Sequence, residues 1–338
     1  MATLADVARR AGVSPATASR VINGSSKPVA DNLRERVLRA VADLRYVPNA
    51  HAQLLARPQR SVVGVVVHDV SDPYFAELTR GLQRVATDHG RLVIICNSYR
   101  DPERELEYVE MLRAQQVAAI VLAGSGYHDA TFTARLAEKL AAYEATGGRV
   151  AVVGRHEHPG DAVMPANADG GRLLGAELLR QGHRRIGVVA GPQVLTTITD
   201  RLDGLRAALA EGGHPLSEER IRYADFDRDG GARAAGELLD AVPGLTALVA
   251  LNDSMAVGAL TLLRARDIPV PGQVSVVGFD DMPVAADVTP ALTTVRLPLV
   301  ELGARAMTLA LGPAADRSRV EVLPATLVVR DSLGPAPD

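Results

Sequence analysis

The sequence lacks several features that define other classes of protein. Cys96 is the single cysteine among the 338 residues, so no disulfide can form within the chain. No run of about eighteen apolar residues occurs, which argues against a membrane-spanning helix. The first residues, MATLADVARRAGV, carry charges where a secretion signal has its apolar segment. These absences predict a cytoplasmic protein in which Cys96, within the apolar run LVIICN, is a reduced core thiol.

Motifs typical of enzymes and metal sites are also missing. The chain has no GxxxxGK[ST] phosphate loop, no HExxH helix and no GxSxG elbow, since the residues around Ser125 read AGSG. His156 and His158 in HEH are two potential metal ligands, but a zinc site needs at least a third, so we expect a solvated loop there. The sequence therefore predicts no catalytic residues, no metal and no cofactor.

Charge is distributed unevenly along the chain. Residues 1–60 contain nine arginines, Lys27 and four acidic residues, a balance of +6. The whole chain carries −3, so the remaining residues carry −9. Attraction to phosphates depends on local rather than total positive charge. The asymmetry predicts a polyanion partner for the N-terminal region alone.

The first sixty residues have apolar side chains at helical spacing in short segments. TLADVARRAG begins with Thr3 as a cap and stops at Gly12. SPATASRVIN begins with Ser14, whose hydroxyl can accept a first-turn amide, and Pro15, which has no amide to leave unpaired. A third helix is expected over about 31–44, with an apolar face formed by Leu33, Val37, Leu38, Val41 and Leu44. Two short helices separated by GVS and backed by a third form a helix-turn-helix.

The helix that begins at Ser14 has an outer face that packing does not explain. Ala18, Val21 and Ile22 recur at helical spacing and can pack inward. The remaining positions are small or polar apart from one arginine: Pro15, Ala16, Thr17, Ser19, Arg20 and Asn23. Such a face favours a helix that inserts into a partner.

Beyond Ser61 the pattern changes to β-branched runs that alternate with longer amphipathic segments. The expected strands are 62–67, 92–96, 118–122, 150–154, 185–190, 247–251 and 274–279. The expected helices include 75–88, 102–115, 172–181, 201–211 and 254–265. Continuous apolar strands alternating with helices indicate parallel sheets covered on both faces. The segment is too long for one core, so we expect an α/β fold of two doubly wound lobes, with ligands at the loop ends of the strands.

The segment from Thr3 to Ala56 resembles the DNA-binding head of the lactose/galactose repressor (LacI/GalR) family. Later blocks resemble the ligand-binding core of that family in the same order: GVVVHDVSDPYFAELTRGL, ELLRQGHRRIGVVAGP, DRLDGLRAAL, ALNDSMAVGAL, VSVVGFDD and TTVRLP. The resemblance implies an all-α helix-turn-helix domain over 1–47 and a hinge helix with linker over 48–60. It implies over 61–338 a two-lobed core, like that of periplasmic binding proteins, that binds effector and dimerises.

The resemblance also implies DNA-binding roles in the head. In this family the two residues after the VS turn and the arginine after TxS read bases, which implies this role for Pro15, Ala16 and Arg20. Arg20 suits a bidentate contact to guanine and Ala16 a thymine methyl group. The residues that would hold phosphates are Ser14, Thr17, Ser19 and Asn23.

The stretch PNAHAQLLA resembles the family's hinge helix, which orders when two copies meet in the minor groove. The resemblance implies that Leu55 inserts between base pairs and kinks the duplex, while Asn49 and Ala52 line the groove. Leu54 stands beside it, and the sequence leaves open whether it shares this role.

Sugar-binding members of the family use an arginine and an acid to bind hydroxyls, with an asparagine and aromatic rings beside them. The matching positions are Ser71, Tyr74, Phe75, Arg201, Phe226, Asn252 and Asp280. An alternative interpretation is that the arginine and the acid merely hold two loops together. Gly154 stands before Arg155 where many members have an acid, which favours a smaller, differently hydroxylated or anionic effector.

These observations predict a homodimeric, effector-responsive repressor of carbohydrate-related genes that binds a pseudo-palindromic operator. The chain ends in LGPAPD without tetramerising heptads, so a dimer is expected, and no membrane partner. The alternatives are a cytoplasmic sugar-binding protein or enzyme with the same core, and a co-repressed or activating regulator. The sequence does not identify the effector, the operator, the target genes or the sign of the response.

Overall fold

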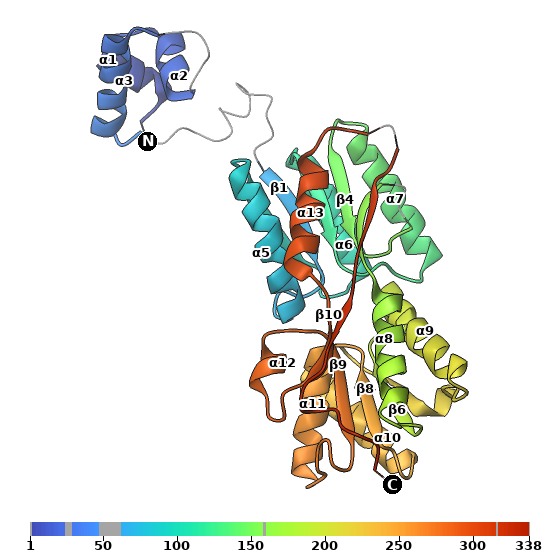
Figure 1. The fold of residues 1–338 in the computed structure, drawn as a ribbon. Coiled ribbons are helices and arrows are strands. Elements are labelled where there is room, and N and C mark those ends of the chain that lie inside the picture. The colour runs from blue at the N-terminus through green and yellow to red at the C-terminus, as the bar shows by residue number, and fades with distance from the viewer. Residues whose placement is uncertain (1, 24–28, 47–61, 158–159, 316, 338) are drawn as a thin grey trace. The chain divides into compact units, whose positions relative to one another are not determined.

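The computed structural model describes residues 2–23, 29–46, 62–157, 160–315 and 317–337. The chain divides into two compact units, Met1–Arg60 and Ser61–Asp338 (Figure 1). Within the described ranges, every helix is too short or too polar to cross a membrane.

The first unit contains three helices, α1 (Leu4–Ala11), α2 (Pro15–Asn23) and α3 (Asp31–Asp43). Thr3 caps α1 through a reciprocal pair of bonds with Asp6, and Gly12 ends it in a left-handed conformation with φ of 62°, as the sequence predicts. The three helices enclose a small core of Val7, Ala8, Ala11, Ala18, Val37 and Ala40. The helix-turn-helix expected from the sequence is confirmed.

The apolar face predicted for α3 is wrong at one position. Leu38 is half-exposed, whereas Ala40 is buried against α1 and α2 together with Val37. Val37, Ala40 and Val41 follow the i, i+3, i+4 spacing of one helical face, and Leu38 lies to one side of it.

The first lobe of the second unit is built on one parallel sheet (Figure 1). Its strands are β1 (Val62–Val67), β2 (Leu92–Asn97), β3 (Ala119–Ala123), β4 (Arg149–Val153), β5 (Asp161–Pro165) and β11 (Val320–Leu323), in the order β11-β5-β4-β3-β1-β2. Helices α5 (Pro73–Asp88) and α13 (Leu299–Leu311) pack together on one side, and α6 (Pro102–Ala114) and α7 (Ala130–Glu144) on the other.

The second lobe repeats this plan. Its strands are β6 (Ile186–Ala190), β7 (Ile221–Tyr223), β8 (Ala247–Ala250), β9 (Ser275–Asp280), β10 (Thr293–Arg296) and β12 (Thr326–Val328), in the order β12-β10-β9-β8-β6-β7. All pairs are parallel except β10 with β12. Helices α8 (Asn167–Arg180) and α9 (Thr196–Glu211) pair on one face, α10 (Arg228–Ala241) and α11 (Asp253–Ala265) on the other, and the short η1 (Glu218–Arg220) and α12 (Val284–Asp287) lie in connections.

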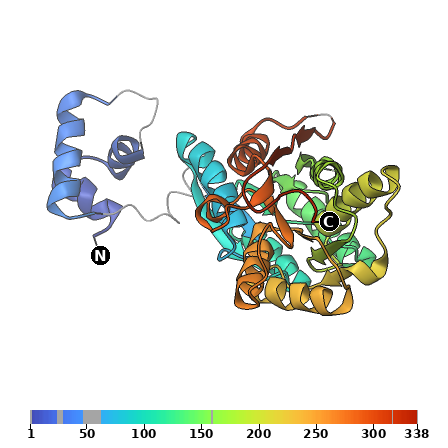
Figure 2. The ribbon, with the colours of Figure 1, turned by 60° about the horizontal axis from the view of Figure 1, so that its bottom comes forward.

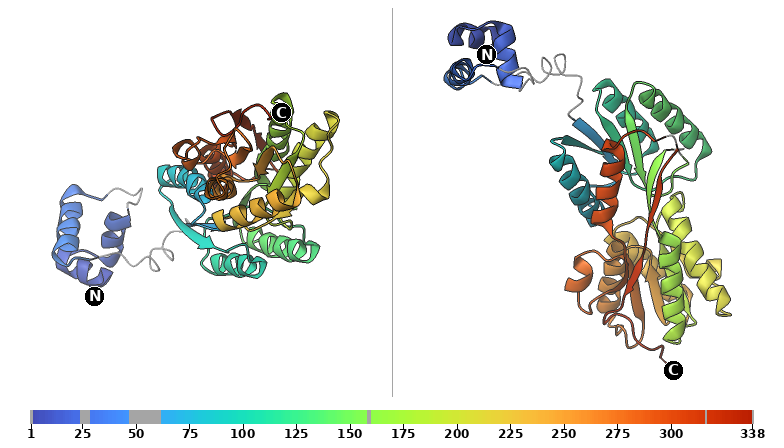
Figure 3. Two further views of the ribbon diagram at one scale, coloured as in Figure 1. Left: turned by 90° about the horizontal axis from the view of Figure 1, so that it is seen from below. Right: turned by 45° about the horizontal axis from the view of Figure 1, so that its top comes forward.

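The chain passes between the lobes three times, after β5, after β10 and after β11. The last passage is the red segment that runs from one lobe to the other in Figure 3. Figure 2 shows helices on both sides of the strands of the core. The two doubly wound lobes expected from the sequence are confirmed, although five short strands, β5, β7, β10, β11 and β12, were not predicted.

Strand β2 departs from the expectation that both sheet faces are covered. It forms the edge of its sheet, and Leu92 is 65% exposed, with Ile94 and Ile95 more than one third exposed. Cys96 is therefore half-buried rather than a core thiol, and burial still raises its pKa. A long apolar strand edge of this kind is a surface suited to a partner.

Glycines permit close crossings between paired helices. A Cβ on Gly171 in α8 would lie 2.1 Å from the carbonyl oxygen of Arg201 in α9. A Cβ on Gly303 in α13 would lie 2.0 Å from the carbonyl oxygen of Leu78 in α5. No other residue lets the two backbones approach so closely, and the first crossing lies at Arg201 itself, in the middle of α9.

Candidate functional site

The outer face of α2 is available to a partner. Ser14 accepts a hydrogen bond from the Thr17 amide at 3.1 Å, so it caps the helix as predicted. Ala18 is fully buried, and Val21 and Ile22 pack on the same small core, which confirms their inward direction. Among the predicted DNA-binding residues, Ser14, Pro15, Ala16 and Arg20 are exposed, and Thr17 and Ser19 are partly exposed.

Asn23 ends α2, and only its backbone is described. The predicted hinge residues, Asn49, Ala52 and Leu55, and the neighbouring Leu54, lie outside the described residues.

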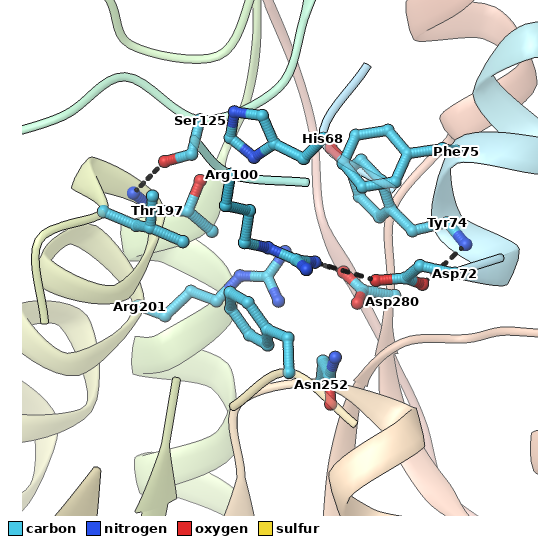
Figure 4. A pocket seen from close by; sticks show the side chains of 12 residues that line it. His68, Asp72, Tyr74, Phe75, Arg100, Ser125, Thr197, Arg201, Asn252 and Asp280 are labelled. Carbon is cyan, nitrogen blue, oxygen red and sulfur yellow. Dashed lines mark hydrogen bonds and ion pairs between the residues drawn. The ribbon is translucent and has the colours of Figure 1, made fainter. Parts of the chain in front are cut away.

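A pocket between the two lobes collects the loop ends of seven strands, where ligands of doubly wound sheets bind (Figure 4). The first lobe contributes side chains that follow β1, β2 and β3, and the second lobe side chains at the ends of β6, β7, β8 and β9. The lining residues are His68, Asp72, Tyr74, Phe75, Arg100, Ser125, Leu195, Thr197, Arg201, Phe226, Asn252 and Asp280.

Six of the seven predicted effector residues line this pocket: Tyr74, Phe75, Arg201, Phe226, Asn252 and Asp280. Ser71 does not line it, because its amide and hydroxyl both bond the carboxylate of Asp69 in the turn before α5. The sequence prediction missed six lining residues, of which His68 and Asp72 belong to the same quoted block as Ser71 and could have been found by including the whole loop after β1.

Arg201 is buried at the base of the pocket and strongly bonded. Its Nε donates to Asn167 at 2.9 Å, one Nη to the Leu251 carbonyl at 2.6 Å, and the other to Asp280 at 2.7 Å. The guanidinium lies 4.0 Å from the ring centre of Phe279. Three bonds leave two N–H groups of the guanidinium for a ligand, so Arg201 is both a structural tie and a donor at the pocket.

Asp280 is the acidic partner of this pair. Burial raises its pKa to about 7, against the opposing charge and hydrogen bond of Arg201, with the charge of Asp72 adding to the rise. Its backbone has φ of 111°, a conformation rarely adopted by residues other than glycine. Strain at a buried carboxylate is typical of a binding or catalytic site rather than of a simple loop tie.

Aromatic rings and a second guanidinium form the walls. Arg100 of the first lobe lies over the ring of Phe226 of the second lobe at 5.3 Å and reaches the Asp72 carboxylate at 3.4 Å. Burial raises the pKa of Asp72 despite its bond from the Tyr74 amide and the charge of Arg100. Asn252 accepts from the Met255 amide at 2.8 Å, so it caps α11 while its side chain lines the pocket.

Arg155 and Gly154 do not line the pocket. The Nε–H of Arg155 is shared between the two carboxylate oxygens of Asp200, and one Nη donates to the same carboxylate at 2.7 Å, so Arg155 ties the first lobe to α9. Gly154 has φ of 94°, and its Cβ would lie 2.9 Å from the Gly124 carbonyl oxygen. The positive φ and the close carbonyl oxygen therefore explain the glycine at this position. Its presence does not indicate the charge of the effector.

The sequence predicted a solvated loop around His156, and for this residue the prediction is wrong. It is half-buried, and its Nε2 lies 2.9 Å from the Gly124 carbonyl oxygen. Burial lowers its pKa. His158 is outside the described residues, and no metal-binding group of three or more His, Cys, Asp or Glu side chains occurs within them.

A helix-turn-helix unit joined to a two-lobed core with a polar pocket defines a DNA-binding regulator that responds to a small molecule. Residues 3–49 match the model of bacterial regulatory proteins of the lacI family, and residues 176–333 match the periplasmic binding protein-like domain. The chain is 37% identical to the HTH-type transcriptional regulator GalR of Escherichia coli (strain K12), over 98% of this chain and 96% of that protein.

The chain is also 40% identical to the HTH-type transcriptional regulator GalS of Salmonella typhimurium LT2, over 98% of this chain and 97% of that protein. A solved structure of the lac repressor dimer bound to operator and the anti-inducer ONPF is similar with a TM-score of 0.84 and 28% identity, covering 98% of each chain. The complex of the transcriptional regulator CelR with cellobiose is similar with a TM-score of 0.71 and 33% identity, covering 98% of this chain and all of that one. The chain belongs to the lacI family of bacterial regulatory proteins.

Proposed function

We propose that the protein is a dimeric repressor that holds an operator until a neutral sugar binds between the lobes of its core. The observation that carries this proposal is the interlobe pocket, in which the Arg201–Asp280 pair lies among aromatic rings in the same chain as an exposed helix-turn-helix face. It acts by binding in the cytoplasm, without catalysis.

The pocket chemistry supports a polyhydroxylated ligand. Arginine N–H groups and carboxylate oxygens offer donors and acceptors to neighbouring hydroxyls, and the rings of Phe75 and Phe226 offer faces to the C–H side of a sugar. Each pocket arginine has a carboxyl group beside it, Asp72 near Arg100 and Asp280 near Arg201, so neither guanidinium lacks an acidic partner within the described site. Neutral sugars are bound in similar proteins, as in the cellobiose complex named above.

The exposed face of α2 supports the DNA-binding part of the proposal. Arg20 reads a guanine, and Pro15 and Ala16 contribute shape and apolar contact in the major groove. Phosphate contacts fall to Ser14, Thr17, Ser19 and Asn23. The hinge contacts of Asn49, Ala52 and Leu55 stay predictions from the sequence.

Dimerisation is supported by the uncovered edge of the first lobe. Leu92, Ile94 and Ile95 of β2 expose apolar surface that a second copy would cover. Two heads held as a pair read two half-sites, which gives the specificity that one head lacks. Sugar binding changes the balance between two arrangements of the lobes, and about 1.4 kcal/mol of differential binding changes operator affinity tenfold.

Two steps test this function. Selection of bound duplexes from a random pool, at two salt concentrations, should yield a two-fold symmetric sequence whose binding weakens with salt. A panel of D-galactose, D-ribose and cellobiose should then release the selected duplex from the wild-type chain. Salt-independent binding, or binding without sequence preference, would contradict the proposal and favour a sugar carrier or enzyme with the same core.

Arg201→Ala separates effector binding from DNA binding. Because Arg201 contacts the pocket but belongs to the second unit of the chain, the variant should bind the selected duplex normally and lose its release by sugar. Gel-shift titration with and without sugar measures both properties, and thermal unfolding checks that the core is folded. Normal release by sugar would contradict the assignment of the pocket.

A further inference from the structure

A buried polar cluster lies behind the first-lobe wall of the pocket. His68 follows β1, and its Nε2 lies 3.1 Å from the Glu105 carboxylate of α6. The same oxygen of Glu105 accepts from the hydroxyls of Tyr127 at 2.8 Å and Ser98 at 3.2 Å. The side chains of His68 and Glu105 are each about 5% exposed or less, so the cluster is closed to bulk water.

Glu105 is held as a carboxylate in this cluster. Burial opposes its ionisation, but the hydrogen bonds that Glu105 accepts from His68 and Tyr127 favour it, and its pKa lies below the ordinary value. An ionised carboxylate only accepts hydrogen bonds. Glu105 therefore requires a proton on the Nε2 of His68. In a neutral imidazole with its proton on Nε2, the other ring nitrogen, Nδ1, can only accept a hydrogen bond.

The other ring nitrogen, Nδ1, faces the pocket (Figure 4). Within the described part of the chain, the structure shows no hydrogen bond to it, although His68 is only 4% exposed. The ring is fixed between Phe75, at 5.8 Å between centroids, and Gly124, where a Cβ would lie 2.7 Å from Nε2. The position is built for an imidazole with one nitrogen toward Glu105 and one toward the ligand.

We propose that His68 is an effector-binding residue whose Nδ1 accepts a hydrogen bond from a sugar hydroxyl, with Glu105 holding the imidazole in the Nε2–H tautomer. This inference rests on the proposed function, since it names a specificity-determining contact of the same pocket. A hydroxyl can donate to Nδ1, and an ether or a carbonyl group cannot, so the contact selects a ligand with a free hydroxyl at that point.

Two amide substitutions divide the roles of the ring. His68→Gln keeps an amide near the position of Nε2, toward Glu105, and vacates the position of Nδ1. His68→Asn places its amide near Nδ1 and offers an acceptor there. Calorimetric titration of the full chain with D-galactose, D-ribose and cellobiose at pH 8 measures the affinities of both variants and wild type.

For a sugar that binds wild type, we expect His68→Gln to weaken binding about tenfold at pH 8. His68→Asn should bind more tightly than His68→Gln at pH 8, because only the asparagine amide can replace the acceptor at Nδ1. The double variant His68→Asn/Glu105→Gln also removes the carboxylate that loses its Nε2–H donor in His68→Asn. It keeps the test valid if the single variant fails to fold. Gly124→Ala should act like His68→Gln, because it displaces the imidazole without changing it.

Nitrogen NMR of labelled histidines tests the tautomer without any sugar. At pH 8 the resonance of His68, assigned by its absence from His68→Gln, should show Nε2 protonated in wild type and a mixture of tautomers in Glu105→Gln. Protonated Nδ1 in wild type, or equal sugar affinity in wild type and His68→Gln, would overturn the inference and leave the proposed function standing. Failure of every sugar to bind wild type would overturn the proposed function and this inference with it.

Discussion

We expect sequence recognition to depend most on Arg20, because its neighbours Pro15 and Ala16 carry no side-chain donor. Arg20→Ala should weaken operator binding by about 1–3 kcal/mol and relax the preference at one base pair of each half-site. Arg20→Lys is the matched control, since it keeps the charge and loses the two-donor fork. Selection of sequences with each variant measures the preference, and an unchanged preference in Arg20→Ala would refute the assigned role.

Asp280 makes a prediction about stability and pH. Its pKa is about 7 in the folded chain and near 3.8 when unfolded, so between these values the folded state holds a proton that the unfolded state has lost. The stabilisation of the folded state by this proton is therefore fully present below pH 3.8 and is lost as pH rises toward 7. It amounts to about 1.4 kcal/mol for each unit between the two pKa values.

Asp280→Asn, which cannot titrate, measures this contribution. Urea unfolding of wild type and Asp280→Asn at pH 5 and pH 8 should show a larger fall in the free energy of unfolding for wild type. Equal falls would mean that the carboxylate is not protonated in the folded chain near neutral pH.

At the scale of elements, the crossing of α8 and α9 positions Arg201. Gly171→Ala would place a Cβ 2.1 Å from the Arg201 carbonyl oxygen, so the helices must separate. We expect a loss of about 1–3 kcal/mol in the free energy of unfolding, together with weaker sugar binding. Gly272→Ala is the control, since its nearest neighbour would be 3.5 Å away and its φ is ordinary. An equal effect of both substitutions would contradict this explanation.

The elements that the sequence predicted best are those with a strong apolar pattern. All seven predicted strands occur, because runs such as VVGVVV in β1 are buried on both sheet faces. The missed strands are short or polar, such as β7 with the residues IRY and β10 with TTVR, and owe their conformation to pairing with a neighbouring strand.

The pocket was predictable only in part, for a related reason. Arg201, Asn252 and Asp280 stand in blocks that resemble the family, and the structure brings them together. Arg100 comes from the loop after β2, where φ is positive at two adjacent residues, and nothing in the local pattern directs its side chain toward Phe226 of the other lobe. Contacts between lobes depend on the tertiary fold, which periodicity does not contain.

At the scale of the whole molecule, the β2 edge predicts how the dimer can be broken. Ile94→Asp should yield a monomer and weaken operator binding by about tenfold or more, because one head then reads one half-site. The Ile94 side chain is 39% exposed in the single chain, and thermal unfolding checks that the variant is folded. Val320→Asp, on the exposed edge strand β11 at the other end of the same sheet, is the control. Sedimentation equilibrium measures the association state, and a dimer of Ile94→Asp would exclude this surface.

The three passages of the chain between the lobes set an order for the synthesis of the protein. The first lobe receives α13 and β11 only after the entire second lobe except β12 has been made. A ribosome that has released the head and the first four strands therefore carries a lobe in which α5 lacks α13, its partner helix on the same side of the sheet. The head leaves the exit tunnel before the core, and the pocket cannot be complete until Asp280, at the end of β9, has followed.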